Sequence, residues 1–299
     1  MTEALIAAAR LHWGLGDAPI AMIAARENHV FSVDLPRHKA ALRAHRRGYR
    51  SVAELNSELM WMDMLAQAGI AVPAPIAASN GSHLLSHNGT IIDMLTWING
   101  HPLGEVEATE AVYFDLGRLM ARMHALADTW TPPAGFERPT WDIVGDAPTW
   151  GTFWENPALS DAQQTKFIQF RNYARRNLTA LQDPNIGLIH ADLVPDNVLI
   201  EGGTLSPIDF DDGGFGHRLF DVATVTFRSR RTDPSGALAK ATLAGYQSLR
   251  QLDTASLPLF EALRACTYVG WNIMRMEEEP TRNARFITAA EQGIARLGF

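Results

Sequence analysis

The sequence has a single cysteine, Cys266, among its 299 residues. One cysteine cannot form an intramolecular disulfide, and it cannot supply the paired thiolates of a CxxC metal or redox site. Hydrophobic runs are short, and none approaches the roughly 18 apolar residues that a membrane-spanning helix needs. The N-terminal segment lacks the basic start and the cleavage-like site of a signal peptide. We therefore expect a cytoplasmic protein with no membrane partner.

Positive charge is not in excess either. The chain carries 26 Lys and Arg residues against 33 Asp and Glu residues, a formal net charge of -7. This disfavours a nucleic-acid partner, because such proteins usually gather basic residues on one face. The one dense basic run, RAHRRGYR from Arg43 to Arg50, is typical of a solvated loop. With 46% hydrophobic and 20% charged residues, the composition is that of a globular protein with a sizeable core.

Short strand-like segments dominate the N-terminal third of the chain. Residues 30–35 and 40–45 predict an antiparallel pair of strands. Residues 83–85 and 90–97 predict two more strands, joined at an Asn-Gly pair that favours a tight hairpin turn. Together these segments predict a small β-rich lobe.

A helix is predicted to follow Ser51. Ser51 and Glu54, three residues later, have the pattern of a capping box. Apolar residues then recur on one face at helical spacing, namely Leu55, Leu59, Met62 and Leu65. Glu58 falls on the same face, so its carboxylate is expected to point inward and to need a cationic partner.

From Glu107 onward the apolar periodicity becomes helical. Apolar residues recur at helical spacing over residues 112–126, 238–249 and 257–274. The larger part of the chain is therefore predicted to be mostly α-helical. We expect an α+β fold with an N-terminal lobe over residues 1–98 and a helical lobe over residues 99–299, connected near Asn99 and Gly100.

The most informative segment is LIHADLVPDNVLIEGGTLSPIDFDD, residues 188–212. It contains His-x-Asp-x-x-x-x-Asn, followed twelve residues after the Asn by Asp-Phe-Asp. Gly202 and Gly203 suit the positive φ angles of a two-residue hairpin turn, and β-like runs flank them. With these glycines at the centre of the turn, Asn197 lies opposite Ile208. Asn197 and Asp209 are then expected to emerge together at the open end of the hairpin.

This pairing predicts phosphoryl-transfer chemistry. A carboxylate beside an amide oxygen suits Mg²⁺, a hard cation that is commonly shared with substrate phosphates. Asp192, in the loop that enters the hairpin, can accept the proton of an attacking hydroxyl, and His190 would brace that loop. The competing interpretation is a structural hairpin with incidental acids. HxD alone is a weak signal, but HxDxxxxN with a correctly spaced DFD is specific, so we favour a catalytic segment.

The sequence resembles a known family at this point. IHADLVPDN, IDFDD, GFGHRLFDVA, LGRLMARMHA and RENHVFSV are similar to the phosphotransferase enzyme family of aminoglycoside phosphotransferases, choline kinases and type II homoserine kinases. These are distant relatives of protein kinases, and the likeness covers most of the chain. It implies a bilobal protein-kinase-like fold and a phosphotransferase with an alcohol group as acceptor. It also implies Mg²⁺ and ATP as cofactors, with GTP as an alternative.

The resemblance assigns roles by position. Asp192 corresponds to the catalytic base, and Asn197 and Asp209 correspond to the metal ligands. Asp221 corresponds to the aspartate that braces the catalytic loop. Asp211 stands where protein kinases have glycine, and it is a candidate for a water-mediated metal contact or for the acceptor site.

The nucleotide-binding pattern departs from that of kinases. Kinases pair a lysine on the third strand with a glutamate of the next helix. Here the strand offers Arg43, which we expect within ion-pair reach of Glu58; the alternative is a solvated strand charge. No GxGxxG precedes the second strand, so the loop over residues 26–29, including Asn28, is expected to cover the phosphates. The backbone of residues 94–97 is expected to bind the base.

The acceptor site is less well specified. Trp141, Trp150 and Trp154 lie in an insertion-like segment over residues 132–159. Packing is their ordinary role, but Trp150 and Trp154 can also form an aromatic wall that holds an ammonium group. Together with the acidic net charge, this favours an amine-bearing acceptor such as an amino alcohol, a hydroxy amino acid or an amino sugar.

Three functions compete: a small-molecule kinase, a Ser/Thr protein kinase of the stress-response type, and a nucleotide-binding pseudokinase. Only eleven residues separate Asp209 from Asp221, and no Ala-Pro-Glu follows, so the long activation segment of ordinary protein kinases is missing. A pseudokinase usually loses a metal or base residue, and here all are present. The small-molecule kinase is therefore favoured, while the acceptor and the oligomeric state are left open.

Overall fold

The structure is a computed structural model that describes residues 3–25, 28–181, 185–275 and 280–299. The chain forms two compact units. The first comprises residues 1–102, 130–138 and 197–211, and the second comprises residues 103–129, 139–196 and 212–299. The expected division at residue 98 stays a prediction.

The first unit contains a five-stranded antiparallel sheet in the order β1-β2-β3-β5-β4. Its strands are β1 (Ile20–Ala25), β2 (His29–Asp34), β3 (Lys39–Ala44), β4 (Leu84–His87) and β5 (Thr90–Thr96). Asn88 and Gly89 both have positive φ angles, 49° and 76°, as a tight turn between β4 and β5 requires. The predicted strands are therefore confirmed to within about two residues. Strand β1 and the helix before it were not predicted.

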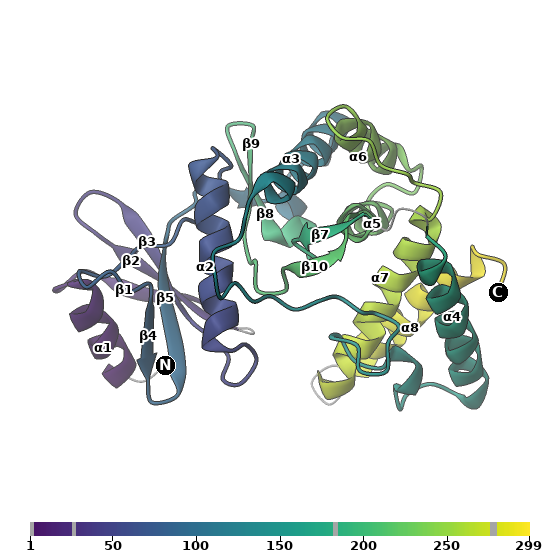
Figure 1. Ribbon diagram of the computed structural model, residues 1–299, viewed down its shortest axis with the longest axis horizontal. Coiled ribbons are helices and arrows are strands. Elements are labelled where there is room, and N and C mark those ends of the chain that lie inside the picture. Colours follow the sequence, from purple (N-terminus) through teal and green to yellow (C-terminus); the bar gives the residue numbers. More distant parts are fainter. Residues whose placement is uncertain (1–2, 26–27, 182–184, 276–279) are drawn as a thin grey trace. The chain divides into compact units, whose positions relative to one another are not determined.

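Helices cover the sheet of the first unit (Figure 1). Helix α1 (Glu3–Trp13) places Leu5 and Ala9 in a cluster with Phe31, Leu42 and other apolar side chains of the strands. Helix α2 (Val52–Gln67) begins at Ser51 with both bonds of the predicted capping box. Its predicted apolar face is buried. Side chains alternate between the two faces of a strand. On β3, Leu42 therefore packs in the cluster with α1, while the next residue, Arg43, contacts Glu58 of α2.

A second sheet in the first unit has the order β6-β8-β9. Its strands are β6 (His101–Pro102), β8 (Val198–Glu201) and β9 (Thr204–Pro207). Gly202 and Gly203 have φ angles of 55° and 83°, and Glu201 pairs with Thr204 across the turn. The predicted hairpin and its register are therefore confirmed.

The second unit is mostly helical. Its helices are α3 (Glu110–Thr129), α4 (Asp161–Thr179), α5 (Arg218–Ser229), α6 (Ala237–Gln247), α7 (Leu257–Trp271) and α8 (Pro280–Ala295). Strands β7 (Ile186–Ile189) and β10 (Gly214–His217) form an antiparallel pair. Short 3-10 turns occur at η1 (Leu103–Glu105), η2 (Phe153–Glu155) and η4 (Asn272–Arg275), and η3 (Pro195–Asn197) precedes β8.

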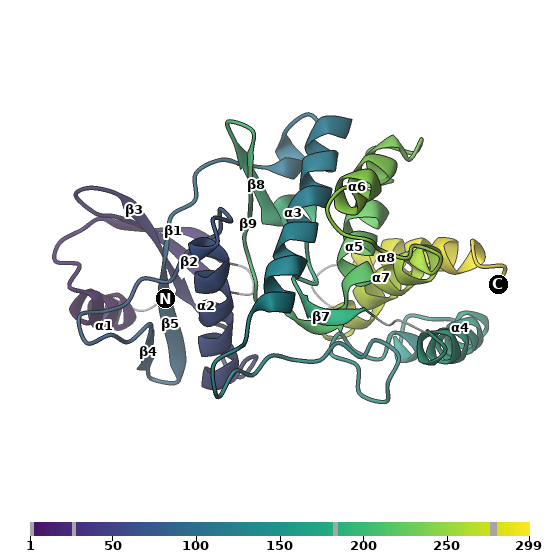
Figure 2. The ribbon, with the colours of Figure 1, turned by 45° about the horizontal axis from the view of Figure 1, so that its top comes forward.

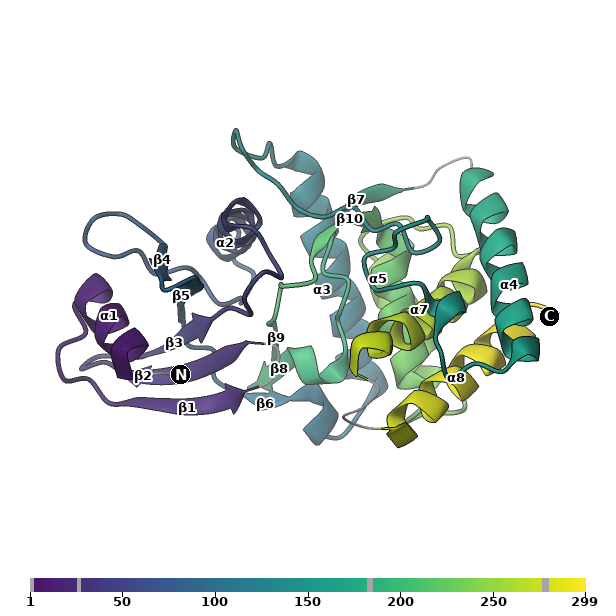
Figure 3. The same ribbon diagram turned by 90° about the horizontal axis from the view of Figure 1, so that it is seen from below.

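Helices α3 and α6 lie side by side (Figure 2). Gly117 on α3 and Gly245 on α6 allow this approach, because a Cβ on either glycine would lie about 2 Å from a backbone oxygen of the other helix. Figure 3 shows α5, α7 and α8 packed together in the same unit. No helix among the described residues is long and apolar enough to cross a membrane.

Candidate active site

The loop after β7 is held by a buried carboxylate of the second unit. Asp221, at the start of α5, is fully buried, and its two oxygens accept hydrogen bonds from the backbone N–H groups of His190 (2.9 Å) and Ala191 (2.7 Å). Ala191 has a φ angle of 67°, a left-handed conformation that is uncommon for alanine. The backbone N–H of Asp192 donates to His190 Nδ1 at 3.4 Å. Asp221 thus fixes an unfavourable backbone turn directly before Asp192.

Sequence reasoning missed a second layer behind Asp221. Nε2 of His124, on α3, lies 3.0 Å from Asp221, and Nδ1 of the same ring lies 2.8 Å from the hydroxyl of Tyr246 on α6. Burial lowers the pKa of His124 below its ordinary value, although Asp221 opposes this. Burial alone would raise the pKa of Asp221, but hydrogen bonds from His124 and from the loop backbone lower it below its ordinary value. A neutral His124 therefore donates to an ionised Asp221.

Asp192 is paired with an arginine that the sequence analysis did not identify. The side chain of Asp192 is 27% exposed, and its Oδ1 accepts from Nη2 of the buried Arg264 on α7. The same Nη2 donates to the hydroxyl of Tyr268 at 2.8 Å. Burial opposes the charge of Arg264, but Tyr268 and Asp192 outweigh it and raise the pKa of the guanidinium. Arg264 therefore holds a fixed positive charge beside Asp192.

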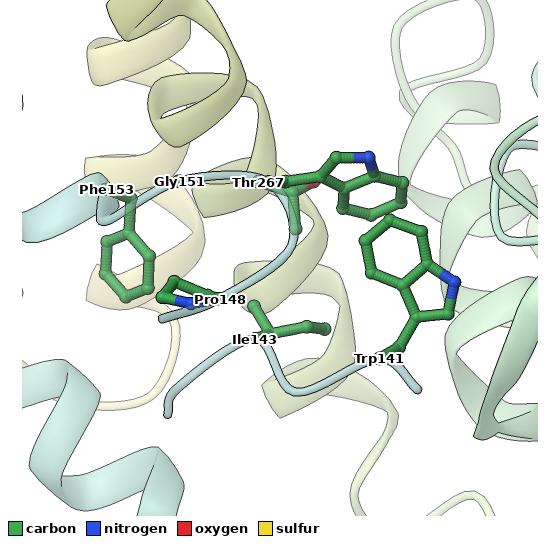
Figure 4. Close-up of a pocket in the computed structure, with 7 residues that line it drawn as sticks. Trp141, Ile143, Pro148, Gly151, Phe153 and Thr267 are labelled. Carbon is green, nitrogen blue, oxygen red and sulfur yellow. The ribbon is translucent and has the colours of Figure 1, made fainter. Parts of the chain in front are cut away.

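The tryptophans of the insertion-like segment are packed against protein groups. The rings of Trp141 and Trp150 are 3.7 Å apart, and the guanidinium of Arg264 lies 5.0 Å from the Trp150 ring centre. Side chains around Trp141 enclose a space with no room for a water molecule (Figure 4). Arg171 lies 4.0 Å from the ring centre of Trp154. Because these arginines already contact the rings, the geometry favours packing for Trp150 and Trp154 over the predicted ammonium wall.

In the first unit, the hairpin brings the two candidate metal ligands to one end. The backbone N–H of Ile208 donates to the carbonyl of Asn197 at 2.9 Å, so Asn197 lies directly opposite the residue before Asp209. Asp209 has a φ angle of 63°, which turns the chain sharply at this point. Among the described residues, no cluster of three or more His, Cys, Asp or Glu side chains is arranged to hold a metal. One carboxylate and one amide still fit Mg²⁺, which keeps waters and phosphate oxygens as its other ligands.

The expected cationic partner of Glu58 is Arg43. Nη1 of Arg43 lies 2.9 Å from Glu58, and both residues are buried, so the prediction of an ion pair is confirmed and a solvated Arg43 is excluded. Asp93 on β5, which sequence reasoning missed, accepts from Nε and Nη2 of Arg43 at 2.9 and 2.6 Å. Nε2 of His45 also lies 2.8 Å from Asp93.

Ion pairing outweighs burial at Arg43, Asp93 and Glu58. Burial alone would lower the pKa of Arg43, but Asp93 and Glu58 raise it well above its ordinary value. Burial alone would raise the pKa of Asp93, but Arg43 and His45 lower it well below the usual range. Burial alone would also raise the pKa of Glu58, but Arg43 and a second arginine, Arg138, lower it. Arg43, Asp93 and Glu58 are therefore charged.

Arg138 links this cluster to the DFD segment within the first unit. Its Nη1 lies 3.3 Å from Glu58, and its Nη2 donates to the carbonyl oxygens of Phe210 and Asp211, both at 2.8 Å. Nε of Arg50 donates to the same Asp211 carbonyl at 3.1 Å. Asp211 itself is 8% exposed. Two arginines thus hold the backbone that follows Asp209.

Two predicted nucleotide contacts have other partners. The carbonyl of Met94 accepts from Ile76 N at 2.7 Å, and the N–H of Thr96 donates to Ala74 at 2.8 Å. These two groups of the 94–97 segment are engaged within the protein, and base binding by its other backbone groups stays a prediction. Oδ1 of Asn28 accepts from the backbone N–H of Arg46 at 3.0 Å. Residues 26–27 of the predicted phosphate loop lie outside the described residues.

Comparison with known proteins places these features in a family. The phosphotransferase enzyme family matches residues 22–264. A homoserine kinase of Mesorhizobium japonicum is 33% identical over 216 residues, which cover 69% of this chain and 65% of the relative. The solved microcompartment-associated aminopropanol kinase superposes with a TM-score of 0.84 at 27% identity, covering 98% of this chain and 96% of its own. An amicoumacin kinase, hAmiN, superposes with a TM-score of 0.82 at 20% identity, covering 97% and 93%.

These likenesses extend over the whole arrangement of strands and helices. They confirm the predicted protein-kinase-like fold with a β-rich N-terminal region and a helical C-terminal part. They also confirm the predicted enzyme class, a phosphotransferase that acts on the hydroxyl groups of small molecules. The chain belongs to the phosphotransferase enzyme family.

Proposed function

We propose that this protein is a Mg²⁺-dependent kinase that transfers the γ-phosphoryl group of ATP to a hydroxyl group of a small molecule, with GTP as the alternative donor. The hairpin register carries the proposal, because the hydrogen bond between Ile208 and Asn197 presents Asn197 and Asp209 at the same end. An amide oxygen and a carboxylate are a suitable donor set for Mg²⁺. When bound, Mg²⁺ would neutralise charge on the β- and γ-phosphates.

Asp192 is the proposed general base. Its carboxylate accepts the proton of the acceptor hydroxyl as the hydroxyl oxygen forms a bond to the γ-phosphorus. The bond between that phosphorus and the bridging oxygen of the β-phosphate breaks, and ADP leaves with the bonding electrons. The Arg264 guanidinium pairs with this carboxylate before the reaction. Asp221 and His190 hold the loop backbone so that Asp192 keeps its orientation.

The phosphate-handling role is proposed for residues 1–98, and the base and acceptor site for residues 99–299. Three of the five N–H donors of Arg43 are committed to Asp93 and Glu58. The remaining donors are the proposed phosphate contact, together with Asn28. Because Arg43 is neutralised by two carboxylates, we expect it to contribute less to phosphate binding than the lysine of other kinases.

The proposed acceptor is an amine-bearing hydroxyl compound, such as an amino alcohol, a hydroxy amino acid or an amino sugar. The similar homoserine kinase and aminopropanol kinase support this class by their names. The short segment between Asp209 and Asp221 leaves no activation segment of the protein-kinase type, which supports a small acceptor. Because Trp150 and Trp154 already contact arginines, we do not assign the amine to these rings.

A screen of acceptors with coupled detection of ADP tests the proposal. Wild-type enzyme with Mg²⁺ and ATP should turn over at least one compound in a panel of amino alcohols, hydroxy amino acids, sugars and aminoglycosides. Asp192→Ala should then lower kcat by about 10²–10⁴-fold with little change in nucleotide affinity. Asp209→Ala should abolish Mg²⁺-dependent nucleotide binding in calorimetry. Near wild-type turnover by Asp192→Ala, or labelling of protein substrates alone, would contradict the proposal.

A further inference from the structure

A large pocket in the helical unit has an unusual charge. It has a volume of about 760 Å³ and lies between the end of α5, Tyr268 on α7, and α8. Six arginines line it, namely Arg228, Arg230, Arg231, Arg282, Arg285 and Arg296. None of its lining residues in the described part of the chain is acidic, although Asp and Glu outnumber Lys and Arg in the whole chain. The pocket therefore concentrates positive charge that the overall composition does not explain.

Most of these arginines have no ion-pair partner among the described residues. Arg230 forms an ion pair with Glu261 at 3.2 Å. Among the described residues, Arg228, Arg231, Arg285 and Arg296 form no ion pair. Guanidinium groups around one space repel each other, and each offers a planar fork of donors that matches a carboxylate or a phosphate. An anion in the pocket would relieve the repulsion and fill those donors.

The pocket also has an aromatic wall. The rings of Tyr268 and Phe286 are stacked, with centroids 5.1 Å apart and an interplanar angle of 21°. The ring centre of Phe227 lies 6.3 Å from that of Tyr268. Such a surface packs against the carbon skeleton of an organic molecule and has no role for a bare inorganic ion. The lining therefore suits a small organic anion.

Tyr268 connects the pocket to the proposed base. Its ring lines the pocket, and its hydroxyl accepts from Arg264 Nη2, the group that also donates to Asp192. Two side chains thus link the arginine-lined pocket to the carboxylate that accepts the hydroxyl proton. All of these residues belong to the same compact unit.

We propose that the acceptor of this kinase carries a carboxylate or phosphate group, and that the pocket between α5 and α8 binds that group. This inference rests on the proposed kinase function and narrows its substrate class. An amine on the same molecule remains compatible, because the arginines bind only the anionic group. Among the acceptors considered above, a hydroxy amino acid fits the pocket and an amino alcohol does not.

Matched acceptor pairs test the inference. L-Homoserine and 3-aminopropan-1-ol differ only by a carboxylate, and glycerol 3-phosphate and glycerol differ only by a phosphate. We expect wild-type kcat/KM to be at least about tenfold higher for the member that carries the carboxylate or phosphate than for the member that lacks it. Comparing the two pairs distinguishes a carboxylate from a phosphate as the bound group. Equal kcat/KM within both pairs would overturn the inference.

The double variant Arg231→Ala/Arg285→Ala removes two exposed arginines of the pocket. We expect it to raise KM for the preferred anionic acceptor by about tenfold or more, since hydrogen bonds to charged groups are lost. KM for ATP should stay within about twofold, because both arginines line the pocket and not the proposed nucleotide contacts. Arg176→Ala, an exposed arginine on α4, is the control and should change neither constant. An unchanged KM for the anionic acceptor in the double variant would refute the pocket assignment.

A binding measurement separates this inference from the kinase proposal. Calorimetry with glycerol 3-phosphate and L-homoserine, without nucleotide, should show binding to the wild type that the double variant loses and that salt weakens. If both proteins phosphorylate the acceptors that carry a carboxylate or phosphate with the same kcat/KM, the kinase proposal stands and the inference fails. If no acceptor is phosphorylated, the kinase proposal fails, and loss of binding in the double variant then still decides whether the pocket takes an anion.

Discussion

Arg43 and Asp93 face each other across β3 and β5 in a forked ion pair, with N–O distances of 2.9 and 2.6 Å. Both side chains are almost fully shielded from solvent. Kinases use a lysine at this position of the third strand, and the fork explains how an arginine is accommodated here. The planar donors of Arg43 are shared between Asp93 on β5 and Glu58 on α2, so one guanidinium connects β3 to both elements.

Removing the charge of Asp93 should destabilise the first unit strongly. We expect Asp93→Asn to lower the free energy of unfolding by about 3 kcal/mol, because Arg43 and His45 lose a buried partner. Asp34→Asn is the matched control, since Asp34 is 53% exposed and pairs with Lys39 at 3.5 Å. It should change stability by less than about 0.5 kcal/mol. Urea unfolding of both variants measures the difference, and equal effects would contradict a buried fork.

Arg138 is expected to position the metal ligand Asp209 through the backbone that follows it. Arg138→Lys keeps a positive charge near Glu58, but a lysine cannot donate to the carbonyls of Phe210 and Asp211 in the same fork. We expect the Mg²⁺ concentration for half-maximal activity to rise by about tenfold, as for other groups that orient metal ligands. Arg122→Lys, an exposed arginine of α3, should leave it unchanged. A lower melting temperature with the same Mg²⁺ dependence would show a purely structural role.

Because His124 is buried, we expect the free energy of unfolding to fall in mild acid. Burial lowers its pKa in the folded state, so the unfolded chain takes up more protons once the pH falls through the unfolded value of about 6.5. The stability that neutral His124 provides is therefore full above that pH and declines below it, by up to about 1.4 kcal/mol per pH unit. Unfolding free energies at pH 7.5, 6.5 and 5.5 should show this slope. His124→Gln should flatten it, whereas the exposed His38→Gln should not.

Ala191 should tolerate glycine better than other buried alanines do. Its φ angle of 67° costs an L-residue about 1–2 kcal/mol, while glycine adopts it freely but loses about 0.5–1 kcal/mol in chain entropy. We expect Ala191→Gly to stabilise the protein by up to about 1 kcal/mol. Ala174→Gly, at a buried site inside α4, should destabilise it by about 1 kcal/mol or more. Destabilisation by both glycines would mean that residue 191 bears no backbone strain.

The sequence was sufficient to locate the chemistry of the hairpin because that chemistry is local. Gly202 and Gly203 fix the turn, and the period of a strand then determines that Asn197 faces Ile208. The capping box at Ser51 and the inward position of Glu58 follow from helical spacing in the same way. Each of these features depends on residues that are close in the chain.

The tertiary structure decided which charged groups share a partner. Arg43 and Asp93 are 50 residues apart, Glu58 and Arg138 are 80 apart, and Asp192 and Arg264 are 72 apart. No periodicity relates such positions, because ion pairs at these separations form only when distant elements pack and exclude water. The arginine-lined pocket arises for the same reason, since α5 and α8 contribute its charges from separate segments. The sequence by itself determined the reacting groups, and the packing of distant helices determined the charges that surround them.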